Sequence, residues 1–232
     1  MYQKVKRMTT TMRIFHWVNA FSILAAVITG LYIANPFYQT LISEPAAYKY
    51  VMAYNRLIHF FAALLLDVIS IAIFYLYFAS RFEKVYKKLI PTKQNIVEFF
   101  EVLLNLLTLN RRKKFDSSHL DSFNAVYFTI LHLLLVWMLL TGFYMYVQGL
   151  ESGLSAIGSW WPALLHLMTD WVGWLLGGHA GVRWWHHFTM WIILAWVAFH
   201  IYYQVWRTIF WREGDIAIVF GGYKFKKVQK QS

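Results

Sequence analysis

The sequence has no cysteine among its 232 residues. The chain itself therefore supplies no disulfide, no thiolate ligand for zinc or an iron–sulfur cluster, and no Cys-x-x-Cys-His motif for covalent haem attachment. A metal bound by this chain needs histidine, methionine or oxygen ligands. Because nine histidines are present, imidazole is the ligand type to examine first.

Charged side chains are also scarce. They make up 14% of the residues, whereas 59% are apolar and 20% are aromatic. This balance is far from that of soluble domains and indicates a protein whose solvent is lipid. A helix needs roughly 20 apolar residues to cross a hydrocarbon core about 30 Å thick. Four stretches meet this requirement, near residues 14–34, 57–79, 125–147 and 185–206. We expect an all-α integral membrane four-helix bundle that forms one domain over residues 1–232, with short interfacial helices.

Acidic residues number 11 against 22 lysines and arginines, which gives a formal net charge of +11. In a soluble chain this excess would suggest nucleic acid, but here we expect membrane lipid and no nucleic acid as a partner. Most of the basic residues lie before the first span, in the connection over residues 80–116, or in the tail over residues 207–232. The positive-inside rule places both termini and that connection in the cytoplasm, and the connection over residues 148–184 in the periplasm.

Residues 160–178 are apolar enough to compete for a fifth span. They contain Pro162, His166 and Asp170, and a span here would move the basic tail to the outer side. We expect an interfacial helix or a packed outer loop.

Residues 95–109 predict another short helix, along the cytoplasmic surface. Polar side chains recur in it at steps of three or four residues and form one stripe along the helix. The segment is too short to span the membrane. The stripe consists of Glu98, Glu101, Asn105 and Thr108.

Four of the nine histidines lie inside the predicted spans or at their ends, where an imidazole without a partner is costly. They are His16, His59, His186 and His200. At about 100° and 1.5 Å per residue, His186 and His200 share one face of the last span and lie roughly 21 Å apart. The neighbouring His187 points about 140° away from His200 and is the poorer candidate. For each histidine taken alone, a hydrogen bond to a neighbouring helix is the alternative.

Predicted depth pairs these histidines. His16 at the cytoplasmic start of the first span matches His200, and His59 at the outer start of the second span matches His186. A site of two imidazoles leaves most of the coordination of zinc, copper or non-haem iron unfilled, whereas haem supplies four ligands itself. We therefore expect two b-type haems in apolar slots of the bundle, one near each face.

Arginines accompany all four histidines. Arg13, Arg56 and Arg183 each stand three residues before a histidine, and Arg207 stands seven after His200. On a helix these spacings give the same face, nearer to water, where a guanidinium can bind a haem propionate through two hydrogen bonds. Arginines that merely extend from helix ends to water are the alternative. Arg183 stands three residues before His186, as Arg13 and Arg56 stand before their histidines, and this spacing does not fit His187.

The other polar features of the spans and connections have simpler explanations. We expect His132, inside the third span, to pack or to lie next to a haem rather than to ligate. His119, His166 and His179 fall in connections. Gly30 and Gly142 each follow a threonine within a span, where they allow a haem or a helix to approach closely.

Several motifs spread over the chain carry a family resemblance. They are Arg13-Ile-Phe-His16-Trp17, Thr29-Gly30, Arg56-Leu-Ile-His59-Phe60, Thr141-Gly142-Phe143, Trp185-His186 and the tail Gly221-Gly222-Tyr223-Lys224-Phe225. The chain resembles the dihaem cytochrome b subunit of membrane-bound nickel–iron uptake hydrogenases, within the bacterial dihaem cytochrome b561 and formate dehydrogenase gamma-like family.

The resemblance implies that the four span histidines are the axial ligands of two haem b groups. It further implies a bacterial cytoplasmic (inner) membrane location, and the small (iron–sulfur) and large (nickel–iron) hydrogenase subunits as partners. Electrons would pass from the outer haem to the inner haem and then to menaquinone or ubiquinone. This chain would transfer electrons and reduce quinone, and would not itself activate hydrogen. Formate dehydrogenase-type members bind quinone near the cytoplasmic haem, where this chain has His119, Asp121 and Asn124.

Two alternatives remain open. One is a cytochrome b subunit of a formate dehydrogenase or thiosulfate reductase, or a free-standing cytochrome b561-like quinone reductase. The other, from a different class, is a haem-free membrane anchor or transporter in which the histidines only pack helices.

Overall fold

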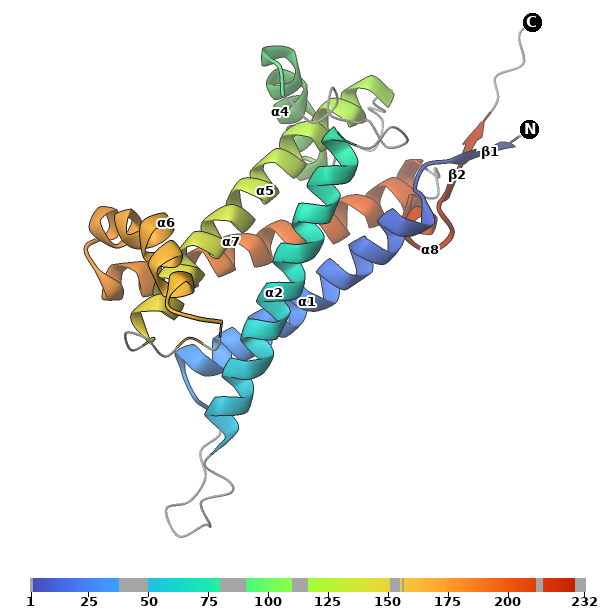
Figure 1. The fold of residues 1–232 in the computed structure, drawn as a ribbon. Coiled ribbons are helices and arrows are strands. Elements are labelled where there is room, and N and C mark those ends of the chain that lie inside the picture. The colour runs from blue at the N-terminus through green and yellow to red at the C-terminus, as the bar shows by residue number, and fades with distance from the viewer. Residues whose placement is uncertain are drawn as a thin grey trace, which may run out of the picture. The chain divides into compact units, whose positions relative to one another are not determined.

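The computed structural model describes residues 2–37, 50–79, 91–109, 117–150, 155, 157–211 and 215–227. Helices account for nearly all of this part of the chain (Figure 1). In chain order the elements are β1 (Tyr2–Lys6), α1 (Thr10–Ala34), α2 (Val51–Phe78), α4 (Lys93–Leu107), α5 (Ser117–Gln148), α6 (Trp160–Leu176), α7 (His179–Trp206), the π-helix η2 (Arg207–Trp211), α8 (Ile216–Gly221) and β2 (Tyr223–Lys227).

Four helices in the described part of the chain are long and apolar enough to cross a membrane. They cover Thr10–Ala34, Val51–Leu76, Ser122–Gln148 and His179–Phe210. The predicted all-α membrane bundle is thereby confirmed. Each helix begins a few residues before the predicted stretch, and the first, second and fourth thereby include Arg13, Arg56 and Arg183. Arg56 and Arg183 are exposed, so their charged ends reach water while the helix continues.

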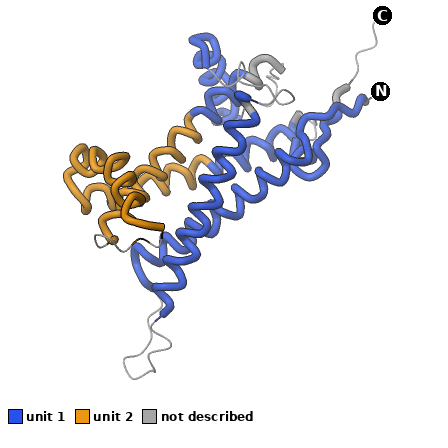
Figure 2. Tube along the Cα trace, in the orientation of Figure 1, with its two compact units in different colours: residues 1–129, 197–232 blue, residues 130–196 orange. Residues whose placement is uncertain are grey.

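The described residues form two compact units, coloured separately in Figure 2. Unit 1 comprises residues 1–129 and 197–232, and unit 2 comprises residues 130–196. Unit 1 contains α1, α2, α4, both strands, α8, the first part of α5 and the last part of α7. Unit 2 contains the rest of α5 and α7, together with α6.

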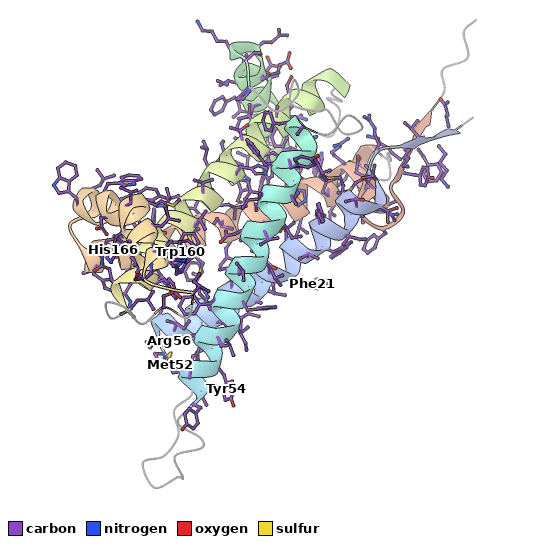
Figure 3. All side chains as sticks on the ribbon, viewed as in Figure 1. Phe21, Met52, Tyr54, Arg56, Trp160 and His166 are labelled. Carbon is purple, nitrogen blue, oxygen red and sulfur yellow. The ribbon has the colours of Figure 1, made fainter. Side chains whose placement is uncertain are left out.

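In unit 1, α1 and α2 pack along each other (Figure 1). Thr9 caps the start of α1, where its hydroxyl oxygen accepts a hydrogen bond of 3.3 Å from the Met12 amide. Large apolar side chains of this helix pair are exposed, such as Phe21 (Figure 3) and Ile71. A lipid solvent favours such exposure, whereas water would oppose it.

Helix α4 confirms the short helix predicted over residues 95–109. A capping box between Thr92 and Asn95 begins it, and its Phe99 ring stacks on Phe123 of α5 at a centroid distance of 5.0 Å. Asn105, part of the predicted polar stripe, is buried with 4% of its surface exposed. The stripe therefore does not face outward along its whole length. The exposed face includes apolar side chains instead, namely Val97, Phe100, Leu104 and Leu107.

The two ends of the described chain meet in unit 1. Strand β1 pairs antiparallel with β2, from Tyr2 opposite Lys227 to Lys6 opposite Tyr223. Together with α8, these strands form a small assembly that we call the terminal cap. It is attached to α1, because the Trp17 indole N–H donates to the Val219 carbonyl at 3.1 Å. The sequence analysis did not predict this pairing.

A buried charge cluster holds the terminal cap together. Asp215 Oδ1 lies 2.9 Å from Arg207 Nη2 and 3.2 Å from Lys224 Nζ. All three side chains are almost fully buried. The cluster joins η2, the start of α8 and β2.

In unit 2, the predicted segment over residues 160–178 contains the helix α6 (Trp160–Leu176), which is not among the four candidate spans. Gly177 and Gly178 end it in left-handed backbone conformations, with φ of 77° and 90°, which allow a tight corner into α7. Tyr144 of α5, Val172 of α6 and Val182 of α7 form the buried core of this unit.

The charge cluster generates a stability prediction. The substitution Asp215→Asn should lower the free energy of unfolding by about 3 kcal/mol, because it removes the carboxylate that pairs with the buried Arg207 and Lys224. Unfolding of the detergent-solubilised protein by denaturant, followed by circular dichroism, measures this loss. The control is Asp170→Asn, which removes an exposed partner of His166 and should cost less than about 1 kcal/mol. Equal stability of the two variants would contradict the prediction.

Candidate functional site

In unit 1 the structure brings His16 and His200 together, as the predicted depths required. Their ring centroids are 6.3 Å apart and the ring planes are inclined at 46°. The Tyr127 ring stacks on His200 at 5.8 Å, and Trp17 packs edge-on against His16 at 5.5 Å. Aromatic side chains thus surround two imidazoles from opposite ends of the chain.

The spacing of these two rings fits a shared metal. Imidazole nitrogens bind metals at about 2.0–2.1 Å, so two nitrogens on opposite sides of one ion are about 4 Å apart. Each ring centroid lies further out than its nitrogen, and a centroid separation of 6.3 Å is therefore compatible with an iron between the rings. His16 Nδ1 is buried and has no hydrogen-bond partner among the described residues. A buried polar atom of this kind is unusual in a purely structural histidine.

The two arginines of this end are already engaged with the terminal cap. Arg13 donates to the Phe220 carbonyl and, at 2.9 Å, to the Thr10 hydroxyl. Arg207 pairs with Asp215 and donates to the Tyr203 hydroxyl at 3.3 Å. Asp215 also pairs with Lys224, so the cluster holds two cationic side chains together in this part of unit 1.

His59 of α2 contacts α1, also within unit 1. Its Nδ1 atom lies 3.0 Å from the Ala26 carbonyl oxygen and 3.0 Å from Thr29 Oγ1. A carbonyl oxygen only accepts hydrogen bonds, so Nδ1 must carry the proton. In a neutral imidazole the lone pair is then on Nε2, the form in which histidine ligates a metal through that atom.

His186 of α7 makes the corresponding contact with α5 inside unit 2. Its Nδ1 atom lies 2.8 Å from Thr141 Oγ1, while the Thr141 hydroxyl donates to the Trp137 carbonyl at 2.8 Å. The adjacent His187 differs, because its Nε2 accepts a hydrogen bond of 3.2 Å from the Trp191 indole. The local contacts thus favour His186 over His187 as a ligand, in agreement with the arginine spacing.

The glycines that follow these threonines bring the helices close to the histidines. A Cβ atom at Gly30 would lie 3.3 Å from His59 Cε1, and one at Gly142 would lie 3.5 Å from His186 Cε1. The sequence analysis predicted the close approach but did not assign a role to Thr29 or Thr141. The repeated Thr-Gly pair was the signal that could have identified them.

Two predicted arginines have no such contacts. Arg56, in the first turns of α2 (Figure 3), is exposed, and so is Arg183. Neither makes a hydrogen bond or ion pair with the part of the chain that the structure describes. Both guanidiniums therefore have their hydrogen-bonding capacity available for a ligand or for water.

The remaining predicted positions are less informative. His132 is half-buried within α5, and His166 on α6 pairs with Asp170 at 2.9 Å (Figure 3). Asn124 is half-buried on α5. The side chains of His119 and Asp121 lie outside the described ones.

Comparison with known proteins identifies the family. Residues 7–222 match the family described as prokaryotic cytochrome b561. The probable Ni/Fe-hydrogenase B-type cytochrome subunit of Cupriavidus necator is 30% identical over 216 residues, covering 91% of this chain and 83% of that protein. The protein of the same description from Azotobacter chroococcum is 28% identical over 233 residues, covering 97% and 92%. The probable Ni/Fe-hydrogenase 1 B-type cytochrome subunit of Escherichia coli K12 is 26% identical over 227 residues, covering 95% and 90%.

These matches confirm the family predicted from the sequence motifs. They also support haem b as the cofactor, and the histidines described above supply ligands of the type that haem b uses. With its four apolar helices, the chain is a multi-pass membrane protein of electron transport. The match over nearly its full length shows that this chain belongs to the prokaryotic cytochrome b561 family.

Proposed function

We propose that this chain is the dihaem cytochrome b subunit of a nickel–iron hydrogenase. In this proposal it carries electrons from a periplasmic hydrogenase, across the bacterial cytoplasmic membrane, to the quinone pool. The observation that carries the proposal is the contact between His16 and His200, a pair of imidazoles between the first and last spans with a spacing that fits one iron. The printed descriptions of the relatives support the hydrogenase assignment.

The proposed ligand pairs are His16 with His200 and His59 with His186. The second pairing rests on the depths predicted from the sequence. Two sites near opposite faces agree with the contacts along α1, where His16 meets His200 and Thr29 meets His59. Thirteen residues separate these two positions, which is about 20 Å along a helix.

Haem b, when bound, supplies reversible one-electron chemistry. The chain contributes imidazole ligands, aromatic surroundings that exclude water, and cations near the helix ends. Arg13 and Arg207 would hold propionates at the His16–His200 site, and Arg56 and Arg183 at the other. These groups fix the position of each cofactor and the electrostatic field around it.

The proposed topology places both termini and the connection over residues 80–116 in the cytoplasm. Quinone, as menaquinone or ubiquinone, would then bind near the His16–His200 site, beside His119, Asp121 and Asn124. Support comes from Asn124, which is one helical turn before Tyr127, the residue that stacks on His200. On the outer side, α6 would help to bind the iron–sulfur subunit, which in turn contacts the nickel–iron subunit.

Haem content tests the ligand assignment. We expect His16→Ala and His200→Ala each to lose the same haem. His59→Ala and His186→Ala should each lose the other haem. The reason is that each variant removes one of the two imidazole ligands that bind the iron. Haem per protein and redox titration of the b-type band in purified protein measure the losses. His187→Ala is the matched control and should keep both haems. Loss of different haems from His59→Ala and His186→Ala would refute the pairing.

Co-purification tests the physiological partner. The chain, tagged and isolated from its native membranes in mild detergent, should bring with it an iron–sulfur protein and a nickel-containing protein. Hydrogen gas should then reduce the b-type band of the isolated complex. A molybdenum-containing partner would instead establish the formate dehydrogenase or thiosulfate reductase alternative, and a chain isolated without haem would establish the anchor or transporter.

A further inference from the structure

Two histidines of the protein share one contact pattern, although they lie in different units. Each has Nδ1 within 3.0 Å of a threonine hydroxyl on a neighbouring helix, His59 with Thr29 and His186 with Thr141. Each threonine is followed by the glycine that faces the same imidazole. Because the same contact recurs on two separate helix pairs, we infer that the threonine hydroxyl has a role other than packing.

The proton positions follow from the threonines' other contacts. The Thr29 hydroxyl lies 2.7 Å from the Ala25 carbonyl, and the Thr141 hydroxyl lies 2.8 Å from the Trp137 carbonyl. A hydroxyl has one proton, and a carbonyl oxygen can only accept. Each threonine hydroxyl therefore donates its proton to a carbonyl of its own helix, and a lone pair of the hydroxyl oxygen faces the imidazole. Nδ1 of each histidine must then be the donor, which leaves Nε2 as the ligating atom.

The other pair of histidines lacks this arrangement. His16 Nδ1 is buried without a hydrogen-bond partner among the described residues. Within the same part of the chain, neither ring nitrogen of His200 makes a hydrogen bond. The two proposed haems would thus have different surroundings for their axial ligands.

We propose that Thr29 and Thr141 are positioning residues that hold His59 and His186 in the Nδ1–H form and make their haem the one of lower midpoint potential. This inference rests on the proposed ligand pairs. An acceptor on Nδ1–H increases the basicity of an imidazole ligand, which favours the more positively charged ferric state. Because electrons move spontaneously from lower to higher potential, this difference drives them from the outer haem to the His16–His200 haem, toward the cytoplasmic side.

Isosteric variants of the two threonines test the proposal. Thr141→Val removes the hydroxyl that accepts from His186, and Thr29→Val removes one of the two acceptors of His59, because the Ala26 carbonyl remains. Both variants keep the volume and the β-branched shape. Each should raise the midpoint potential of the same single haem and leave the other haem unchanged, because a hydroxyl acceptor is lost from one ligand pair only. The haem retained by His59→Ala provides the potential of the His16–His200 haem, so the shifted one can be identified. Thr29→Ser and Thr141→Ser keep the hydroxyl and should restore the wild-type potential.

A control and a second measurement separate this effect from packing. Thr169→Val is the matched control. Thr169 is fully buried, and its hydroxyl donates to the Leu165 carbonyl of its own helix at 2.7 Å, as the hydroxyls of Thr29 and Thr141 do to carbonyls of theirs. It should leave both potentials unchanged. The low-spin ferric electron paramagnetic resonance signals report how each imidazole is held, and we expect one of them to shift in Thr29→Val and Thr141→Val only.

The outcomes distinguish this inference from the proposed function. If the histidine variants lose haem as expected but the valine variants leave potentials and resonance signals unchanged, the threonine role is refuted while the haem assignment stands. A higher potential for the His59–His186 haem in the wild-type protein, or shifts of two different haems, would also refute it. If the wild-type protein binds no haem, or if His59→Ala keeps both, the proposed function itself fails.

Discussion

Inside a bilayer no water is available to satisfy a polar side chain, and this constraint governs how each histidine of the spans is held. Two of them, His59 and His186, donate Nδ1–H to a hydroxyl whose own proton is bound to a helix carbonyl. A third, His16, has a buried Nδ1 without a partner among the described residues. The imidazoles of the spans are therefore held in two different ways.

The charged residues follow the same constraint. Asp215, Arg207 and Lys224 are buried together just beyond the last span, where a carboxylate without cations would be costly. This cluster lies in unit 1, the unit in which His16 and His200 meet. In this way the terminal cap supplies both mechanical support and an electrostatic environment for the site beside it.

Hydropathy was sufficient to predict the four spans, since lipid imposes a length and a composition that are visible in the sequence. Three predicted spans began after Arg13, Arg56 and Arg183, whereas the helices begin before these residues. Depth was sufficient to predict the contact of His16 with His200. The contacts of Thr29 and Thr141 with histidines were not predicted. The partner of a hydroxyl depends on how two helices pack, and not on the position of the threonine along one helix. The pairing of β1 with β2 was missed because each strand is only five residues long and the two are far apart in sequence.

That pairing has a consequence for how the protein is made. β2 is synthesised after all four spans, so β1 leaves the ribosome with no strand to pair with until translation is almost complete. The same order applies to His16, whose neighbour His200 belongs to the last span. His186 lies in the same last span, so both proposed histidine pairs form only after that span has been synthesised. A prematurely terminated chain lacks the strand partner and one imidazole of each proposed pair.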